Sequence, residues 1–96
     1  MRIADFLGRG AENALTLRDL QALTGADGRT IRLEIEQARR AGVPILSNCR
    51  DGYFLPAGED EKALFVRQMR RRAGEILRTA AAVEKATDGE GAEPIG

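Results

Sequence analysis

The sequence has no histidine, no tryptophan and one cysteine, Cys49, among its 96 residues. Without histidine or a second cysteine the common zinc ligand sets cannot form, and a single thiol cannot make an internal disulfide. Ser47 is the only serine, and no histidine is present to activate it as a nucleophile. We therefore expect no enzyme activity, no bound metal and no cofactor. The single cysteine is also typical of a protein in a reducing compartment.

Aromatic residues are also scarce, at 4% of the chain, while hydrophobic residues make up 43%. No apolar run approaches the roughly 20 residues needed to span a bilayer. The first residues include Asp5 and lack the apolar segment of a signal peptide. These features predict a cytoplasmic protein with a small aliphatic core.

Charge of one sign does not dominate, because 15 basic residues balance 15 acidic ones. Zero net charge argues against a protein that coats nucleic acid by charge alone, although segregated charge could still bind it. Apart from Lys62 and Lys85, every basic residue is arginine. The planar arginine fork suits phosphate and guanine better than lysine does.

The first part of the chain predicts two short helices. One covers residues 1–7, and the other begins at Thr16, which forms a capping box with Asp19 three residues later. Between them, residues 14–15 could form a short strand that pairs with a later hairpin. The side chains expected to point inward are Ile3, Phe6, Leu7, Leu17, Leu20 and Leu23.

The central segment predicts a helix-turn-helix. Residues 24–26 form a three-residue turn that contains glycine, and Asp27 is a favourable cap for the next helix, over residues 29–41. At about 100° per residue, one face of this helix is apolar and expected to be buried. That face carries Ile31, Ile35, Ala38 and Gly42.

A β-hairpin is predicted directly after this helix, with strands at residues 43–47 and 53–55 and a tight loop at residues 48–52. A helix followed at once by a small hairpin is typical of a winged helix-turn-helix. The expected fold class is therefore mainly α with a small β-hairpin wing, within a domain of residues 1–56. We expect Leu20, Ile31, Ile35 and Phe54 to form its core.

Residues 57–86 are expected to contain a long helix, and the glycine-rich, acidic residues 87–96 a disordered tail. The helix, from about residue 61, would be roughly 40 Å long, so part of it should pack on something outside its own domain. A second copy of the chain is the simplest partner, which predicts a homodimer; alternatively, a shorter helix folds back on the core. The expected oligomerisation stripe is Phe65, Met69, Ala73, Ile76, Ala80 and Val83, and Arg67, Arg71, Arg78 and Lys85 lie nearly opposite.

The outward face of the helix at residues 29–41 is the candidate site. In a helix-turn-helix such a face enters the major groove of double-stranded DNA, where arginine can contact guanine or phosphate and glutamine can pair with adenine. Alternatively, it is a solvated face on which Glu36 pairs with Arg32 and Arg40. An arginine in the hairpin loop could contact phosphate or be solvated. The candidate DNA-binding residues are Arg29, Thr30, Arg32, Leu33, Glu36, Gln37, Arg40 and, in the loop, Arg50.

Three segments, at residues 29–32, 41–45 and 52–55, resemble the winged-helix domain of biotin-repressor and DeoR-type regulators. The whole chain is similar to stand-alone winged-helix proteins of phages and prophages, in which an arginine-rich helix like residues 69–78 follows the wing. Leu33 departs from the pattern, because such regulators commonly carry a polar residue there.

The resemblance implies a three-helix core with a wing and sequence-specific binding of double-stranded DNA. It also implies a regulatory role. Together with the long helix, this leads us to expect a small transcriptional regulator that acts as a dimer, located at the nucleoid in the bacterial cytoplasm. No small-molecule ligand is expected, because the ligand-sensing domains of the larger regulators are missing from this sequence. The alternative is a protein-interaction adaptor in a phage replication or packaging complex.

Overall fold

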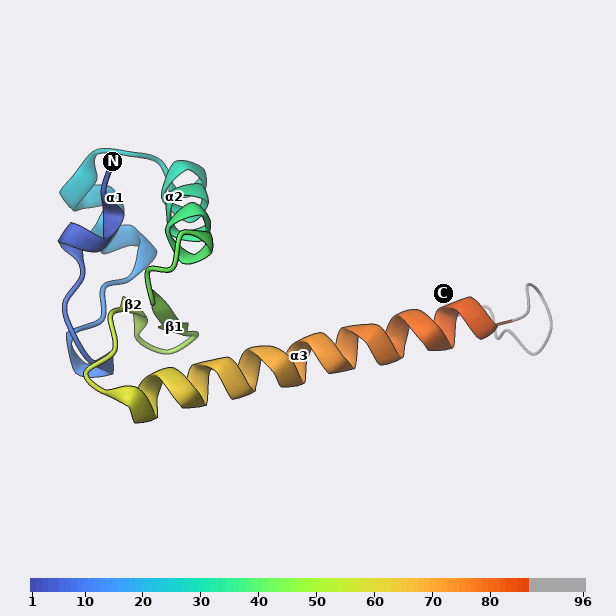
Figure 1. Ribbon diagram of the computed structural model, residues 1–96. Helices are drawn as coiled ribbons and strands as arrows, with labels where there is room; N and C mark the ends of the chain where they lie inside the picture. The colour runs from blue at the N-terminus through green and yellow to red at the C-terminus, as the bar shows by residue number, and fades with distance from the viewer. Residues whose placement is uncertain (87–96) are drawn as a thin grey trace. The chain divides into compact units, whose positions relative to one another are not determined.

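The computed structural model describes residues 1–86, and the predicted tail lies outside the described residues. The chain is mainly helical, with helices, a two-stranded antiparallel hairpin and then a long C-terminal helix (Figure 1). This order confirms the predicted fold class, a winged helix-turn-helix followed by a long helix. Contacts divide the chain into a unit at Met1–Phe65 and a second unit that begins at Val66. The domain predicted from the sequence covers residues 1–56, followed by the long helix.

The predicted first helix is a short 3-10 helix, η1, at Ile3–Phe6, and a second 3-10 helix, η2, spans Ala11–Asn13. Ile3 and Leu7 are buried as expected. Phe6, expected to point inward, is exposed. The helix ends there, and Leu7, with extended backbone, supplies the second buried side chain instead.

Helix α1, Leu17–Thr24, begins with the predicted capping box. The Asp19 amide donates to Thr16 Oγ1 at 3.1 Å, and the Thr16 amide donates to the Asp19 carboxylate at 2.9 Å. Leu20 is fully buried, but Leu23 is 57% exposed, contrary to expectation. The inward position one turn after Leu20 belongs to Thr24, whose hydroxyl donates to the Leu20 carbonyl.

Helix α2, Gly28–Arg40, is capped by Asp27, which accepts a hydrogen bond of 2.8 Å from the Thr30 amide. Ile31 and Ile35 are buried. Gly42 is exposed and not on the buried face as expected, because the helix ends before it. The amides of Gly42 and Val43 donate to the carbonyls of Arg39 and Ala38, a Schellman ending in which glycine adopts a φ of 97°.

Strands β1, Leu46–Asn48, and β2, Gly52–Phe54, pair antiparallel, with Leu46 opposite Phe54. β1 is shorter than the predicted strand at residues 43–47, whereas β2 has the predicted length and begins one residue earlier. Leu15 pairs with Tyr53 on the other side of β2 through hydrogen bonds of 2.8 and 2.9 Å, which confirms the expected extra strand segment. This close approach requires glycine at position 52, because a Cβ there would lie 2.2 Å from the Leu15 carbonyl oxygen.

The core of the first unit is aliphatic, as its composition predicts. Of the four side chains expected to meet there, Leu20, Ile31 and Ile35 do so. Phe54 is buried opposite Leu46 in the hairpin but is not part of this cluster. The cluster consists of Ile3, Leu7, Leu20, Ile31, Ile35 and Ile45.

Helix α3 spans Glu59–Lys85 and begins two residues before the predicted start at Glu61. Its first turn is attached to the first unit by the Glu61 carboxylate, which accepts hydrogen bonds from the amides of Ala57 at 2.7 Å and Ala11 at 3.1 Å. None of its residues is buried. Among residues 1–86, no helix combines the length and apolar character that crossing a membrane requires.

Candidate nucleic-acid interface

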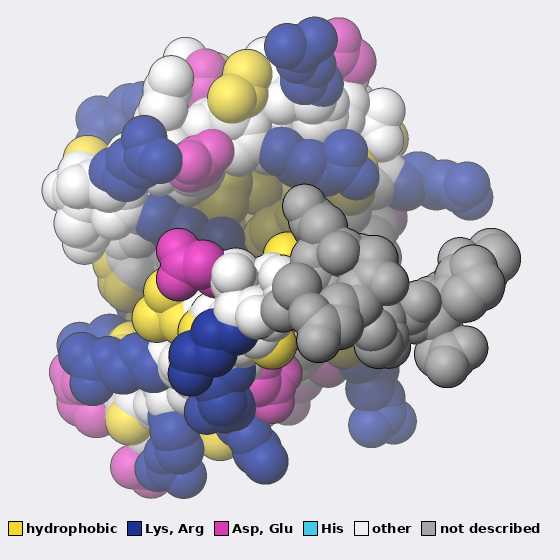
Figure 2. Space-filling view, turned by 90° about the vertical axis from the view of Figure 1, so that its right-hand side faces the viewer, with side chains coloured by type: hydrophobic (Ala, Val, Ile, Leu, Met, Phe, Trp, Pro, Cys, Tyr) yellow, Lys and Arg dark blue, Asp and Glu magenta, His cyan; other side chains and the backbone are white. Residues whose placement is uncertain are grey.

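The outward face of α2 is formed by the side chains that the sequence singled out. All seven are exposed, while Ile31 and Ile35 on the opposite face are fully buried in the core. Over the surface seen in Figure 2, basic side chains are interspersed with fewer acidic ones. The α2 residues on the candidate face are Arg29, Thr30, Arg32, Leu33, Glu36, Gln37 and Arg40.

Arg39, which the sequence did not single out, joins α2 to the hairpin. Its Nε donates to the Ile45 carbonyl at 2.7 Å, and its Nη2 donates to Ser47 Oγ at 3.1 Å. Its guanidinium also lies 5.2 Å from the centroid of the Phe65 ring, within the range of a cation–π contact. Burial lowers the pKa of the Arg39 guanidinium, while Tyr53 opposes that shift. Arg39 therefore fixes the wing against α2.

The remaining arginines of α2 differ in their partners. Arg40 forms an ion pair of 2.7 Å with Glu36, one of the two pairs that the solvated-face alternative requires. Within residues 1–86, neither Arg29 nor Arg32 forms an ion pair. The exposed arginines without a charged partner thus lie in the first half of α2.

Leu33 lies in the middle of this outward face and is 49% exposed. Thr30 presents an exposed side chain while its amide is occupied by the Asp27 cap. Leu33 is therefore an exposed apolar side chain among polar side chains on the candidate face.

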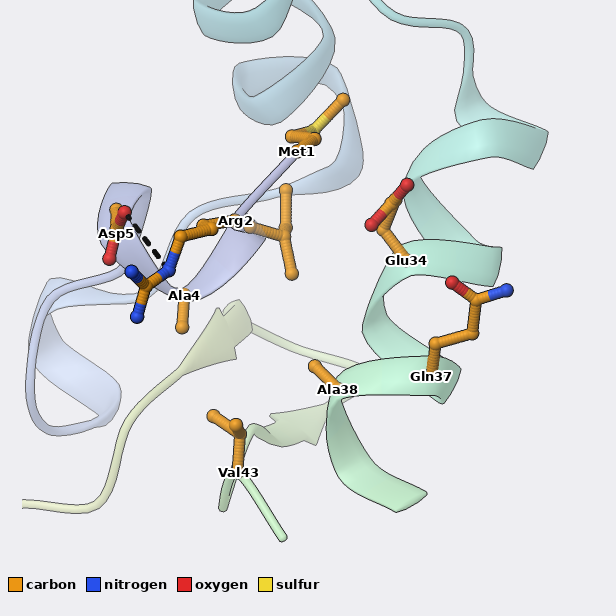
Figure 3. A pocket seen from close by; sticks show the side chains of 9 residues that line it. Met1, Arg2, Ala4, Asp5, Glu34, Gln37, Ala38 and Val43 are labelled. Atoms are coloured by element: carbon orange, nitrogen blue, oxygen red, sulfur yellow. Dashed lines mark ion pairs between the residues drawn. The ribbon is translucent and has the colours of Figure 1, made fainter. Parts of the chain in front are cut away.

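Gln37 lies at the edge of the α2 face, where it borders a hollow of about 290 Å³ (Figure 3). Arg2 and Asp5 line the hollow from the N-terminal segment, with 3.9 Å between the guanidinium and the carboxylate. Glu34 and Gln37 line it from α2 (Figure 3). Ile3 and Ala38 also line it and pack in or against the core, so this hollow is a gap between η1 and α2.

The wing loop presents Arg50, which is exposed. The loop is held by Asn48, whose side-chain oxygen accepts from the amides of Arg50 and Asp51 and whose nitrogen donates to the Asp51 carboxylate. Such a local turn holds the backbone while leaving the arginine side chain free in solvent. Cys49 beside it is exposed.

The predicted oligomerisation stripe is split by the structure. Phe65 belongs to the first unit and contacts Arg39. The other five side chains, all in the second unit, are exposed. They are Met69, Ala73, Ile76, Ala80 and Val83.

No family model, no curated protein and no solved structure matches this chain. The resemblance to biotin-repressor and DeoR-type regulators therefore stays a prediction. Any proposal about function depends on the geometry of α2, the wing and α3.

Proposed function

We propose that this protein binds specific sequences of double-stranded DNA, with the first half of α2 in the major groove, and acts as a small transcriptional regulator. The observation that carries the proposal is the position of Arg29 and Arg32. Both are exposed and without a charged partner among the described residues, on the half of the helix that meets bases in helix-turn-helix proteins.

The chemistry of this face suits base recognition. Each arginine can donate two hydrogen bonds to guanine, and Gln37 can pair with adenine. Leu33 would contact a thymine methyl group, which gives an exposed leucine at this position a role. The Thr30 hydroxyl would donate to a backbone phosphate.

The wing supports the same docking. Arg50, at the tip of a loop braced by Asn48, would contact a phosphate beside the groove. Arg39 does not contact DNA in this proposal. It fixes β1 to α2, so that a phosphate contact from the wing sets the register of the recognition helix.

The test begins with selection of bound sequences from random duplex DNA. Arg32→Ala should then weaken binding to the selected site by about 1–3 kcal/mol, because a bidentate contact to a base is lost. Arg2→Ala is the matched control, since it also removes one exposed arginine but lies in the N-terminal segment. Unchanged affinity in both Arg32→Ala and Arg29→Ala would overturn the assignment of α2 as the recognition helix.

The wing is tested separately by Arg50→Ala. This change should weaken binding to all sequences about equally and reduce the salt slope by about 1, because one phosphate contact is lost. If only the selected sequence were affected, Arg50 would contact a base.

A second candidate function is a protein-interaction adaptor in a phage replication or packaging complex. The exposed apolar side chains of α3 favour it, because such surfaces often mark protein contacts. Salt dependence separates the two functions. Binding to duplex DNA should weaken steeply as salt rises, since phosphate contacts release counterions, whereas an adaptor would show no such duplex binding.

A further inference from the structure

The second unit exposes a regular apolar stripe on α3. From Val66 to Val83, apolar residues recur at spacings of three and four residues, and all are exposed. This is the heptad spacing with which helices pack against one another in coiled coils. Phe65 is outside the pattern because its ring contacts Arg39. The heptad stripe consists of Val66, Met69, Ala73, Ile76, Ala80 and Val83.

We propose that a second copy of this chain covers the heptad stripe, with the two α3 helices antiparallel. In this alignment the stripe pairs with itself in six layers related by a two-fold axis, of which three are distinct. Val66 faces Val83 of the second copy, Met69 faces Ala80, and Ala73 faces Ile76.

The sizes of the side chains select the antiparallel alignment. Each alanine of the stripe then faces a large residue, so all layers have similar volume and the helix axes can stay at a constant distance. In a parallel pair, each residue would face its own copy. Met69 and Ile76 would form wide layers and Ala73 and Ala80 narrow ones, which leaves gaps.

The charges beside the stripe select the same alignment. From Val66 to Lys85 there are six basic residues and two acidic ones, Glu75 and Glu84. In the antiparallel pair, Glu75 lies about 3 Å along the axis from Arg72 of the second copy, and Glu84 is similarly placed near Arg67. Both acids thus gain a cationic neighbour. In a parallel pair, Glu84 faces Thr79 and Arg72 faces Leu77, so neither contact joins opposite charges.

The surface of the helix has a place for the largest side chain of the stripe. A shallow hollow on α3 is lined by Arg72, Glu75, Ile76, Thr79 and Ala80. Met69 of the second copy would enter this hollow beside Ala80. Leu77, which is 70% exposed, would cover the aliphatic part of Arg70 of the second copy.

The alignment determines where the first units are attached. Each chain enters the paired segment at Val66, and the two Val66 residues lie at opposite ends of the pair, about 25 Å apart along the axis. Two-fold symmetry further predicts an inverted-repeat DNA site; this part alone rests on the proposed function.

Sedimentation without DNA tests the pairing. The wild-type chain should pass from monomer to dimer as its concentration rises, and Ile76→Glu should remain a monomer because it buries unpaired charge in the pair. Ala81→Glu, which adds the same charge on the outward face of α3, should still dimerise. Ile76 is 61% exposed, so neither change disturbs the core of the first unit. A wild-type monomer at every concentration, or equal dimerisation of both variants, would overturn the proposal.

Disulfide formation tests the direction, in a Cys49→Ser background that removes the native exposed thiol. A mixture of Val66→Cys and Val83→Cys chains should form a crosslinked heterodimer under mild oxidation. Neither variant alone should crosslink, because its two cysteines would lie much farther apart than the roughly 7 Å limit between Cα atoms. A mixture of Arg71→Cys and Arg78→Cys has the same axial alignment on the outward face and should not crosslink.

Crosslinked homodimers of Val66→Cys, with no crosslinked heterodimer in the mixture, would mean a parallel pair and would overturn the antiparallel one. These measurements contain no DNA, so their failure is separate from failure of the proposed function. If the chain is a monomer and Arg32→Ala still weakens its binding to selected DNA, the proposed function stands and the proposed pairing is wrong.

Discussion

Isoleucine has opposite environments in the two units. In Met1–Phe65, Ile3, Ile31, Ile35 and Ile45 are each at most 2% exposed, whereas Ile76 in the second unit is 61% exposed. Burial of apolar surface contributes about 25 cal/mol per Å², so the first unit has a source of stability that residues 66–85 do not have by themselves. The first unit buries its core without a partner, whereas the apolar side chains of the second unit would be buried only by a partner.

The arginines differ in the same way. Arg39 in the first unit is half-buried and bonded to Ile45 and Ser47. Arg67, Arg70, Arg71, Arg72 and Arg78 in the second unit are all exposed, and no ion pair is found for them within residues 1–86. The same residue type thus fixes a structure in one unit and remains available for contacts in the other.

The largest predicted effect compares one substitution in both units. Ile35→Ala should lower the free energy of unfolding by about 2–5 kcal/mol, because it leaves a cavity in the core. Ile76→Ala should leave the stability of the first unit unchanged when measured at concentrations where the chain is monomeric. Chemical denaturation followed by Tyr53 fluorescence would report on the first unit alone. Equal effects would show that Ile76 packs on the core of its own chain.

A smaller effect compares neighbouring arginines of α2. Arg39→Met keeps most of the aliphatic stem but removes the hydrogen bonds to the hairpin, and should cost about 1–3 kcal/mol. Arg40→Met removes only an exposed ion pair with Glu36 and should cost less than about 1 kcal/mol. Thermal unfolding of the two variants gives the comparison. A silent Arg39→Met would mean that the wing does not depend on this contact.

The smallest effect concerns the helix caps of the first unit. The hydrogen bond from the Thr30 amide lowers the pKa of Asp27, and that from the Thr16 amide lowers the pKa of Asp19, from the ordinary value of 3.8. Because these pKa values are lower in the folded state, the stabilisation is present above pH 3.8 and is lost as the pH falls through the folded values. The melting midpoint should therefore fall at acid pH.

Asp27→Asn provides the control, because asparagine accepts the same capping hydrogen bond without titrating. This variant should show a weaker decline of the melting midpoint at acid pH than the wild type. An identical decline would exclude Asp27 as a source of the pH dependence.

The parts of the fold that the sequence predicted correctly depend on local signals. Thr16 with Asp19, and Asp27 with the Thr30 amide, are caps that close within three residues. The hairpin likewise follows from a short loop between apolar segments. Phe6, Leu23 and Gly42 were predicted to be buried but are exposed, because helical periodicity does not hold at or beyond the end of a helix.

For the candidate site, the sequence predicted which side of α2 is exposed but not how its arginines differ. Periodicity places Arg39 at the flank of the buried face, next to Ala38, and gives no indication of a partner. Its partners follow from where β1 and Phe65 come to lie. The structure therefore distinguishes three kinds of arginine on α2. Arg29 and Arg32 have no ion pair, Arg39 is bonded to the hairpin, and Arg40 pairs with Glu36.

The sequence by itself determined the caps, the apolar face of α2, the hairpin and the heptad spacing of α3, because each depends on residues within a few positions of one another. Only the tertiary structure decided that Gly52 must be glycine, because Leu15 comes so close to it, and that Phe65 contacts Arg39. Those contacts join segments far apart in the chain, and their energies depend on packing and desolvation that no local pattern encodes.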